Sequence, residues 1–381
     1  MHILHIIGTL DPRAGGPQTA MRMLIDFQPE GYTSEVVTTD LPDAPFLAEY
    51  PVPAHGAGSG GWYAPKLVPW LKANRSRFDG VIVHGLWEYT GIAARKAFSG
   101  HVPYVVFPHG MLDSYFKRTF PMKHLKKWLF WLLAEYWNLR KASRVLFTTE
   151  LEEKLAAESF PLLYRWRAEI APLGSIAAPP RSEAQLDAFY ARCPEVRGQR
   201  FMLYLGRIHP KKGADLLLKA FTLRQSDIHL VMAGPGADDE WAQGLRSALP
   251  ADVAARVHWP GMLQGDAKWG AFHASDAFVL PSHQENFGIA VVEALAAARP
   301  VLITEPVNIS PEIEADGAGL VGKDTVEGVS SLLKRWLTLN ESDRAAMGEQ
   351  ALRTFAKRYD MRRNTGPILQ VFERIRADRR R

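Results

Sequence analysis

The chain has 381 residues, more than a single hydrophobic core usually supports, so we expect two domains. Its formal net charge of +5 would suit a nucleic acid, an anionic membrane or a phosphorylated ligand, but no nucleic-acid-binding motif accompanies the charge, so no nucleic-acid partner is expected. The single cysteine, Cys193, excludes an internal disulfide, no Cys/His cluster has the spacing of a zinc site, and a reduced, cytoplasmic compartment is expected.

Residues 1–8 form an apolar run that predicts the first strand of a sheet. The run has neither a basic segment nor a small-residue cleavage site, which disfavours a signal peptide. No apolar run in the sequence approaches the roughly 18 residues that span a bilayer. We therefore expect a soluble protein or one that lies on a membrane surface.

The loop at 9–17 carries Gly15 and Gly16 ahead of a predicted helix. Glycines let a backbone approach a ligand closely and the helix N-terminus could hold a phosphate, although a flexible turn is an equally good interpretation. The spacing is not Gly-x-Gly-x-x-Gly, and the second predicted strand, 35–38, does not end in the usual ribose-binding acid. A nicotinamide dinucleotide site is therefore disfavoured.

Short β-rich runs then alternate with helical patterns, and two of the runs lead into a His-Gly pair. Residues 80–83 run into His84, and residues 103–107 run through a proline into His109. Such alternation predicts parallel strands in a doubly wound sheet, whose ligands gather beyond the carboxyl ends of the strands. A single histidine more often has a structural role. Two histidines at equivalent strand ends favour a functional one.

Residues 117–144 are basic and aromatic, with eight Lys and Arg residues against one acid, Glu135. The segment is too short to span a bilayer but could lie in the interface of an anionic membrane. A helix packed on the sheet with a solvated basic face is the more frequent structure for such a pattern. The Arg-rich end of the chain, 379–381, leaves the same two interpretations open.

A Pro-containing stretch separates the two alternating halves. It includes Pro179 and Pro180 and a short amphipathic helix, after which strand character resumes at Phe201. We predict an α/β protein with a first domain over 1–175, a linker over 176–199 and a second doubly wound domain over 200–359.

The second domain opens with a strand, a glycine, cations and a helix start. Arg207 can bind two oxygens through its planar guanidinium, while Lys212 supplies a mobile point charge. This order of elements predicts a phosphate site. Two further strand ends, near Gly234 and Met262, lie on the side where a planar base could bind.

Residues 276–280 predict a buried strand that leads through a polar loop to a helix beginning near Gly288. The N-terminus of a helix favours a phosphate or another anion. Two carboxylates bracket the loop, Glu285 before the helix and Glu293 in its second turn. Both could face one ligand.

These residues together resemble the retaining glycosyltransferases of family 4, which have the GT-B fold. The resemblance rests on Arg207 with Lys212, and on the acids within Pro-Ser-x-x-Glu-Asn-Phe-Gly-x4-Glu. Gly-Gly at 15–16, His-Gly-Leu-Trp at 84–87 and Pro-His-Gly-Met at 108–111 match too, so it covers nearly the whole chain. It implies two Rossmann-like domains, of which the second binds a nucleotide-sugar, and a final helix, 360–381, that crosses back onto the first.

The resemblance also implies roles for the site residues. The cations would neutralise the donor diphosphate, Glu293 would bind the ribose hydroxyls, and Glu285 would contact the transferred sugar. The implied catalytic residues are His109, Glu285, Arg207 and Lys212. The implied donor-binding residues are Gly15, Gly16, Asn286, Phe287, Gly288, Ile289, Glu293, Gly234 and Met262. The implied acceptor-side residues are His84 and Trp87.

Retention of the anomeric configuration, as the family implies it, uses front-face attack with the leaving phosphate as base. Fixed cations and a helix dipole can stabilise that phosphate without a metal, and no Asp-x-Asp pair follows a strand, so no metal and no cofactor are expected. The His-Gly-Leu-Trp and Pro-His-Gly-Met elements resemble the branch that builds bacterial lipopolysaccharide and exopolysaccharide. They imply a hexosyl transfer to a glycan or lipid-linked glycan acceptor.

One element departs from the family pattern, since only Pro311 and Glu312 remain of its usual Gly-Gly-x-Pro-Glu. A nucleotide-sugar epimerase or a phosphorylase on the same fold stays open as an alternative, although no motif for a pyridoxal-type lysine is evident. An inert partner subunit is the non-enzymatic alternative, and the intact site residues disfavour it. The expected location is the cytoplasm, with peripheral attachment to the inner face of the cytoplasmic membrane as a further hypothesis.

Overall fold

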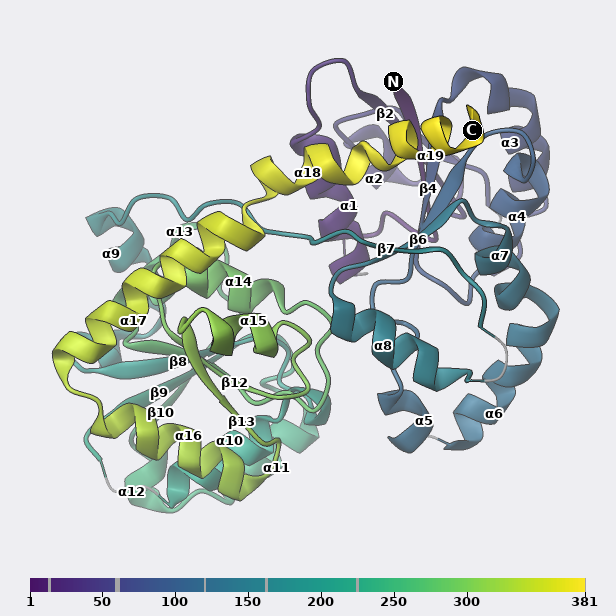
Figure 1. Cartoon of the computed structure of the whole chain (residues 1–381). Coiled ribbons are helices and arrows are strands. Elements are labelled where there is room, and N and C mark those ends of the chain that lie inside the picture. The colour runs from purple at the N-terminus through teal and green to yellow at the C-terminus, as the bar shows by residue number, and fades with distance from the viewer. Residues whose placement is uncertain (13–14, 59–61, 120, 162–163, 224–225, 381) are drawn as a thin grey trace. The chain divides into compact units, whose positions relative to one another are not determined.

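The computed structural model describes the chain apart from residues 13–14, 59–61, 120, 162–163, 224–225 and 381. The chain divides into two compact units, one formed by Met1–Leu173 with Met361–Arg381 and the other by Gly174–Asp360. In each unit a parallel sheet lies among helices, which confirms the predicted α/β class (Figure 1). Among the described residues, no helix is long and apolar enough to cross a bilayer.

The first unit is built on a sheet that has seven strands within its described residues, in the order β3-β2-β1-β4-β5-β6-β7. The strands are β1 (His2–Ile7), β2 (Thr33–Thr38), β3 (Ala54–Gly56), β4 (Gly80–His84), β5 (Tyr104–Phe107), β6 (Arg144–Phe147) and β7 (Ala168–Ile170). The helical segments are α1 (Gly16–Asp26), α2 (Pro45–Ala48), α3 (Leu67–Asn74), η1 (Arg75–Arg77), α4 (Tyr89–Phe98), α5 (Tyr115–Thr119), α6 (Pro121–Phe130), the π-helix η2 (Trp131–Glu135), α7 (Tyr136–Lys141), α8 (Glu150–Ser159), α18 (Met361–Leu369) and α19 (Val371–Arg380).

Both faces of this sheet are covered. Ile6 and Val37 pack into one hydrophobic cluster, whereas their neighbours Ile7 and Val36 pack into another. Successive strand residues point to opposite faces, so both sides of the central strands carry apolar side chains. The near-continuous apolar runs that predicted these strands follow from this two-sided burial.

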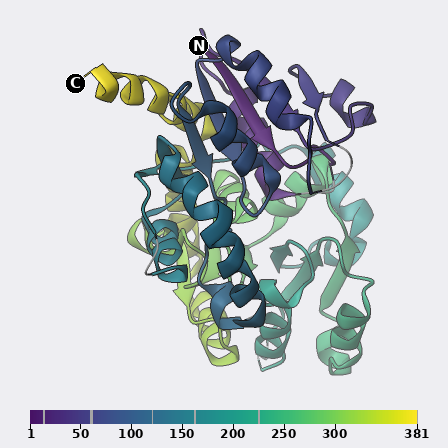
Figure 2. The same ribbon diagram turned by 90° about the vertical axis from the view of Figure 1, so that its right-hand side faces the viewer.

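The last two helices, α18 and α19, belong to the first unit. Phe372 packs on Gly80 at the start of β4, where a Cβ atom would lie 2.5 Å from the ring. Arg376 forms an ion pair with Asp79 at 2.5 Å. In both views the yellow C-terminal helices lie at the same end of this unit as the N-terminus (Figures 1 and 2).

The second unit is built on a sheet that has six strands within its described residues, in the order β10-β9-β8-β11-β12-β13. The strands are β8 (Phe201–Leu205), β9 (His229–Ala233), β10 (Val257–Gly261), β11 (Ala277–Leu280), β12 (Val301–Thr304) and β13 (Gly319–Gly322). The helical segments are α9 (Glu183–Arg192), η3 (Pro194–Val196), η4 (Pro210–Lys212), α10 (Ala214–Thr222), α11 (Glu240–Ser247), α12 (Ala251–Ala254), α13 (Gly265–Ala274), α14 (Ile289–Ala296), α15 (Ser310–Ala315), α16 (Val326–Thr338), α17 (Glu341–Thr354) and the π-helix η5 (Phe355–Tyr359).

The segment predicted as a linker, 176–199, is part of the second unit, whose first residue is Gly174. Its helix α9 starts with a capping box between Ser182 and Gln185 and packs against α13. The two helices approach so closely at Gly270 that a Cβ there would lie 2.0 Å from the Gln185 carbonyl oxygen. The Pro-containing composition suggested a linker, but tertiary packing fixes this segment.

Candidate active site

The strand order of the second sheet reverses between β8 and β11. Open α/β sheets bind ligands outside the carboxyl ends of the strands that flank such a reversal. Gly206 and Arg207 follow β8 at this edge, and Pro281 follows β11. The predicted cations and the predicted acidic loop therefore come from the two strands that flank the switch point.

The turn that carries Lys212 is fastened to the loop after β11. Gly213 caps α10 with a left-handed φ of 67°, and a Cβ here would lie 1.9 Å from the carbonyl oxygen of Pro281. The N–H of His283 donates to the Lys211 carbonyl oxygen at 2.9 Å. Glycine alone combines the left-handed backbone with so close an approach, so the Lys-Lys-Gly sequence places its second lysine beside the acidic loop.

Lys212 and Glu285, both predicted as catalytic, form an ion pair in this structure. Their side chains are 25% and 17% exposed, so the pair is largely withdrawn from solvent but still within reach of a ligand. Burial, with the charges of Lys211 and Arg207, lowers the pKa of Lys212 to about 8. Arg207 itself is exposed. Cations outnumber the paired acid here, which suits an anionic ligand.

Helix α14 begins directly behind the acidic loop, which confirms the strand, loop and helix predicted there. Its N-cap, Gly288, has a left-handed φ of 72°. The first N–H groups of the helix, beginning at Ile289, have no acceptor within it and lie at the positive end of the helix dipole. Together with Lys212 and Arg207, these N–H groups are the positive charges and donors that a diphosphate binds.

A loop after β12 supports the acidic loop. The N–H of Glu285 donates to the Pro306 carbonyl oxygen at 3.1 Å, and the Asn308 N–H donates to the Glu285 carbonyl oxygen at 2.9 Å. The Asn308 side chain, 1% exposed, also donates to Asn286 Oδ1 at 3.3 Å. Sequence reasoning missed Asn308, since it lies where the family pattern is lost and pairs mainly through its backbone.

Glu293 projects from the second turn of α14 and is 9% exposed. Lys268 Nζ on α13 donates to Glu293 Oε1 at 2.7 Å. An ion pair with this geometry orients the carboxylate. Lys268 was missed from the sequence, because nothing in α13 marks one lysine as the partner of an acid on another helix.

Gly234 lies at a point where three strand ends meet. Its N–H donates to the Gly261 carbonyl oxygen at 2.9 Å, and a Cβ would lie 1.9 Å from the Gly206 carbonyl oxygen. Its N–H is therefore already engaged and packing alone requires glycine, while its role in donor binding stays a prediction. Met262, next along β10, is 55% exposed and presents an apolar surface near this edge.

The first unit brings the two predicted histidines together. His84, the last residue of β4, places Nδ1 3.0 Å from Nε2 of His109, which follows β5. His84 Nε2 lies 3.0 Å from Nδ1 of His5 on β1, a residue that sequence reasoning passed over as part of a buried strand. Burial lowers the pKa of His5 and of His109 to about 3.

The prediction that His84 contacts an acceptor needs correction. His84 is 1% exposed and both of its ring nitrogens are engaged by histidines, so it is shielded from a ligand. Trp87 has a left-handed φ of 68°, donates its N–H to the buried Glu135 and its Nε1–H to the Met111 carbonyl oxygen. His84 therefore supports His109 from within the sheet, while Trp87 is partly exposed and its acceptor-side role stays a prediction.

Gly15 and Gly16 open helix α1. Gly15 is the N-cap with φ 92°, and a Cβ at Gly16 would meet no atom of the described residues within 4 Å. As far as those residues go, the space in front of Gly16 is open, as a backbone contact to a ligand requires. Their role as donor contacts stays a prediction.

Two family models divide the chain between them. Residues 15–174 match a model described as "Glycosyl transferase 4-like domain", and residues 191–354 match "Glycosyl transferases group 1". The chain belongs to the family 4 glycosyltransferases. The resemblance found from the motifs is thereby confirmed.

Curated members of the family match over part of their length. A D-inositol 3-phosphate glycosyltransferase of Arthrobacter sp. (strain FB24) is 31% identical over 191 residues, 45% of this chain and 43% of that protein. A phosphatidyl-myo-inositol mannosyltransferase of Mycolicibacterium smegmatis is 30% identical over 226 residues, 56% of this chain and 55% of that protein. This family 4 glycosyltransferase thus spans about half the length of the curated relatives it matches.

Solved structures match over the full length. Alr3699/HepE of Anabaena, in complex with UDP and glucose, has a TM-score of 0.78 at 15% identity and covers 97% of this chain and 99% of its own. A sucrose-phosphate synthase of Thermosynechococcus elongatus has a TM-score of 0.75 at 18% identity, covering 99% and 100%. These likenesses show that this family 4 glycosyltransferase has the GT-B fold.

The first unit of this family 4 glycosyltransferase holds a cavity of about 700 Å³ beside the ends of β1 and β2. Trp62, 52% exposed, and Glu88 line it. Burial raises the pKa of Glu88, and among the described residues its Oε2 atom has no hydrogen-bond partner. The Oε2 atom is itself buried, so the exposed ring of Trp62 is the feature that suits the apolar face of a sugar.

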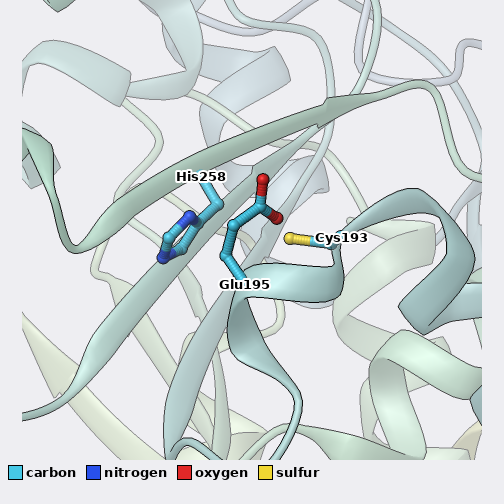
Figure 3. Close-up of side chains that lie close together, drawn as sticks. All are labelled: Cys193, Glu195 and His258. Carbon is cyan, nitrogen blue, oxygen red and sulfur yellow. The ribbon is translucent and has the colours of Figure 1, made fainter.

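One further group of possible metal ligands was found among the described residues. Cys193, Glu195 and His258 place their ligand atoms within 4.8 Å of one another, and Figure 3 shows the three side chains gathered together. Spacing alone missed this group, because its histidine comes from the distant edge strand β10. Burial raises the pKa of the Cys193 thiol to about 12, so the thiol is protonated at neutral pH. The group lies away from the switch point.

Proposed function

We propose that this family 4 glycosyltransferase is a retaining, metal-independent enzyme that moves a hexosyl unit from a nucleotide-diphosphate sugar to a glycan or lipid-linked glycan. The observation that carries the proposal is the meeting of Lys212, Glu285 and the start of α14 at one switch point. Cations and unpaired N–H groups suit the diphosphate, and the two carboxylates suit hydroxyl groups.

Rupture of the sugar–diphosphate bond leaves negative charge on the departing oxygen. Lys212 and the N–H groups of α14 are in place before the reaction, so together with the exposed Arg207 they stabilise this charge with little reorganisation. The acceptor oxygen bonds to the anomeric carbon on the face from which the diphosphate departs. The acceptor proton passes to the departing phosphate oxygen, so no carboxylate nucleophile is required.

The binding roles follow from geometry and charge. Glu293, oriented by Lys268, binds the ribose hydroxyls, and Glu285 leaves its pair with Lys212 to bind the transferred sugar as the diphosphate takes the lysine. Asn286, Phe287 and Gly288 shape the backbone around the phosphates. On the first unit, His109 acts near the reacting centre and Gly16 contributes a backbone contact.

We further propose that the acceptor sugar occupies the cavity lined by Trp62 and Glu88. The sugar ring stacks on the indole, which is half exposed in the cavity. Names of relatives include glycosyl and mannosyl transfer to inositol compounds, and the motifs resemble those of surface-polysaccharide enzymes. Bacterial surface polysaccharide synthesis in the cytoplasm is the proposed setting.

Calorimetric titration with UDP- and GDP-sugars tests donor binding directly. We expect one nucleotide-sugar to bind the wild-type protein, Lys212→Met to weaken it strongly, and Lys219→Met to bind like the wild type, because Lys219 is exposed and pairs with Asp215 on the surface of α10. Wild-type affinity in Lys212→Met would contradict the site. Incubation with the bound nucleotide-sugar alone then separates the classes, since an epimerase would convert the sugar whereas a transferase gives only slow hydrolysis.

An exposed apolar stripe supports peripheral membrane attachment through the first unit. Five large side chains along one face of α6 and η2 are between 44% and 70% exposed, namely Met122, Leu125, Leu129, Leu132 and Leu133. The opposite face buries Trp131 completely against Phe160. Lys123 and Lys126 are exposed beside the stripe. Apolar insertion and phosphate attraction together describe an anionic lipid surface.

Co-sedimentation with vesicles tests this attachment. We expect binding to phosphatidylglycerol-containing vesicles that falls as salt rises, and loss of binding in Leu125→Glu/Leu129→Glu. Leu352→Glu, at an exposed leucine of α17, is the matched control. Equal sedimentation of the double variant and wild type would contradict the proposal, as would self-association through the stripe without vesicles.

A further inference from the structure

Three imidazoles form a row across the middle of the first sheet. His5 on β1, His84 on β4 and His109 after β5 come from three neighbouring strands. The rings stack with centroids 5.3 Å apart in both steps and interplanar angles of 17° and 13°. Each neighbouring pair shares one hydrogen bond of 3.0 Å between a ring Nδ1 and a ring Nε2.

The row continues into the body of the unit beyond His5. His5 Nε2 lies 3.3 Å from the Ser34 hydroxyl on β2, and that hydroxyl donates to Gln28 Oε1 at 2.8 Å. His5 and His84 are 0% and 1% exposed and Ser34 is 6% exposed. Five side chains thus form one continuous path that ends at His109, the member nearest the carboxyl edge of the sheet.

All three imidazoles are neutral at neutral pH. Burial lowers the pKa of His5 and His109 to about 3, and burial together with the two flanking imidazoles lowers the pKa of His84 well below its usual range. A neutral imidazole has one N–H donor and one lone-pair acceptor. The direction of any one bond in the row therefore fixes the direction of the next.

The direction is set at the far end. A hydroxyl has one hydrogen, and Ser34 gives it to Gln28, so Ser34 must accept from His5 Nε2–H. His5 Nδ1 then accepts from His84 Nε2–H. His84 Nδ1 in turn accepts from His109 Nε2–H.

We propose that Gln28 and Ser34 set the tautomer of His109 through His5 and His84, so that His109 holds its proton on Nε2 and offers the lone pair of Nδ1 as an acceptor. No hydrogen bond to His109 Nδ1 is made by the described residues. Gln28, Ser34, His5 and His84 are positioning residues in this arrangement, and none of them needs to touch a ligand.

The backbone next to His109 supports a fixed presentation of its ring. His109 has a left-handed φ of 51°, and the N–H of the next residue, Gly110, donates to the buried Glu152 at 2.7 Å. Resting on the proposed function, the tautomer has a chemical consequence. A lone pair at Nδ1 accepts a hydrogen bond from a sugar hydroxyl and repels a phosphate oxygen, so His109 selects the sugar part of the donor.

Nitrogen NMR of the ligand-free protein tests the tautomer independently of any activity. In ¹⁵N-histidine-labelled protein, long-range ¹H–¹⁵N correlation distinguishes protonated from unprotonated ring nitrogens, and loss of signals in His109→Gln assigns the residue. We expect Nε2–H on His109 in the wild type at pH 7. A proton on Nδ1 would overturn the proposal even if nucleotide-sugar transfer were established.

Two substitutions at Gln28 test the origin of the direction. Glu can only accept a hydrogen bond and Lys can only donate one, so Gln28→Glu should keep Nε2–H on His109 and Gln28→Lys should move its proton to Nδ1. Ser34→Ala, which breaks the path, should give a mixture of both forms. Thr33→Ala, an exposed neighbour on β2, is the control and should leave the tautomer unchanged.

The amide spectrum confirms that each variant is folded, and Ser34→Ala provides a second test if Gln28→Lys does not fold. A His109 tautomer identical in the wild type and Ser34→Ala would contradict the proposal. In kinetics, Ser34→Ala should lower kcat/KM by about tenfold, comparable with one neutral hydrogen bond, with Gln28→Glu close to wild type. If Ser34→Ala changes the tautomer of His109 but leaves kcat/KM unchanged, the proposed role of His109 in sugar recognition is wrong. The control of its tautomer by Gln28 and Ser34 would still stand.

Discussion

Both sheets reverse their strand order at a central pair of strands. The two units place different side chains there, a charged pair in the second unit and neutral histidines in the first. In the second unit the reversal carries an ion pair, Lys212 with Glu285, that is still partly exposed. In the first unit the strands at the reversal, β1 and β4, carry His5 and His84, which are buried and neutral.

The charge at the end of a strand decides which kind of interaction that strand end can make. A partly exposed cation can exchange its protein carboxylate for a ligand phosphate with little loss of solvation. A buried neutral imidazole gains nothing from an anion but transmits hydrogen-bond direction through its two nitrogens. Charge recognition and hydrogen-bond orientation are thus assigned to different units of this chain.

The largest expected effect comes from removing the central cation of the second unit. Lys212→Met should lower kcat/KM by about 100- to 1000-fold, because a preorganised charge that stabilises a developing oxyanion is typically worth that much. Steady-state kinetics with the preferred nucleotide-sugar measures the change. Lys219→Met, at an exposed lysine of the neighbouring helix α10, is the control and should stay near the wild-type rate.

The buried histidines of the first unit should make stability acid-sensitive. Their folded-state pKa lies below the unfolded value, so stability is complete above about pH 6.5 and is lost as the pH falls below it, by about 2 kcal/mol per histidine at pH 5. His5→Leu removes one such group. The drop in unfolding free energy between pH 7 and pH 5, measured by urea titration, should therefore be smaller in His5→Leu than in the wild type.

The ion pair behind Glu293 should have an intermediate effect. Lys268→Met leaves Glu293 without its partner at 2.7 Å, so we expect the donor Kd to rise about tenfold as the carboxylate loses its orientation. Calorimetry measures the affinity. An unchanged Kd would mean that Glu293 does not depend on Lys268 or does not contact the donor.

The smallest expected effect is on the pH profile. Lys212, with a pKa of about 8, loses its charge as the pH rises, so kcat/KM should fall about threefold between pH 7.5 and 8.5. Lys212→Arg should remove this decline, and Glu285→Gln should shift it to lower pH, since the carboxylate favours the charged lysine. The neutral histidine row should add no inflection in this range.

Features that depend on neighbouring residues could be predicted from the sequence. The predicted strand at 276–280 and the predicted helix start near Gly288 agree within a residue with β11 and α14. An apolar run, a polar loop and a glycine in succession are local signals that need no information about distant residues. The Lys-Lys-Gly turn was recognised for the same reason. The α/β class and the GT-B fold followed from the alternation and the motifs.

Features that depend on distant partners could not be predicted. Lys268 becomes a site residue only because α13 brings it to Glu293, and His5 matters only because β1 lies beside β4. The linker prediction failed for a related reason, since the contact of α9 with Gly270 of α13 is a tertiary fact. The sequence singled out His84, but its burial is a property of the folded sheet. That burial leaves His84 able to position His109 and unable to contact a ligand.

The central claim is retaining sugar transfer from a nucleotide-sugar, and the anomer of the first released sugar tests it most directly. The wild-type protein is incubated with the α-linked nucleotide-sugar that it binds, without acceptor, and proton NMR follows the earliest hydrolysis product before mutarotation. We predict that the α-anomer is released first, and that Lys212→Met abolishes the release. Initial release of the β-anomer, or equal release by Lys212→Met, would contradict the account.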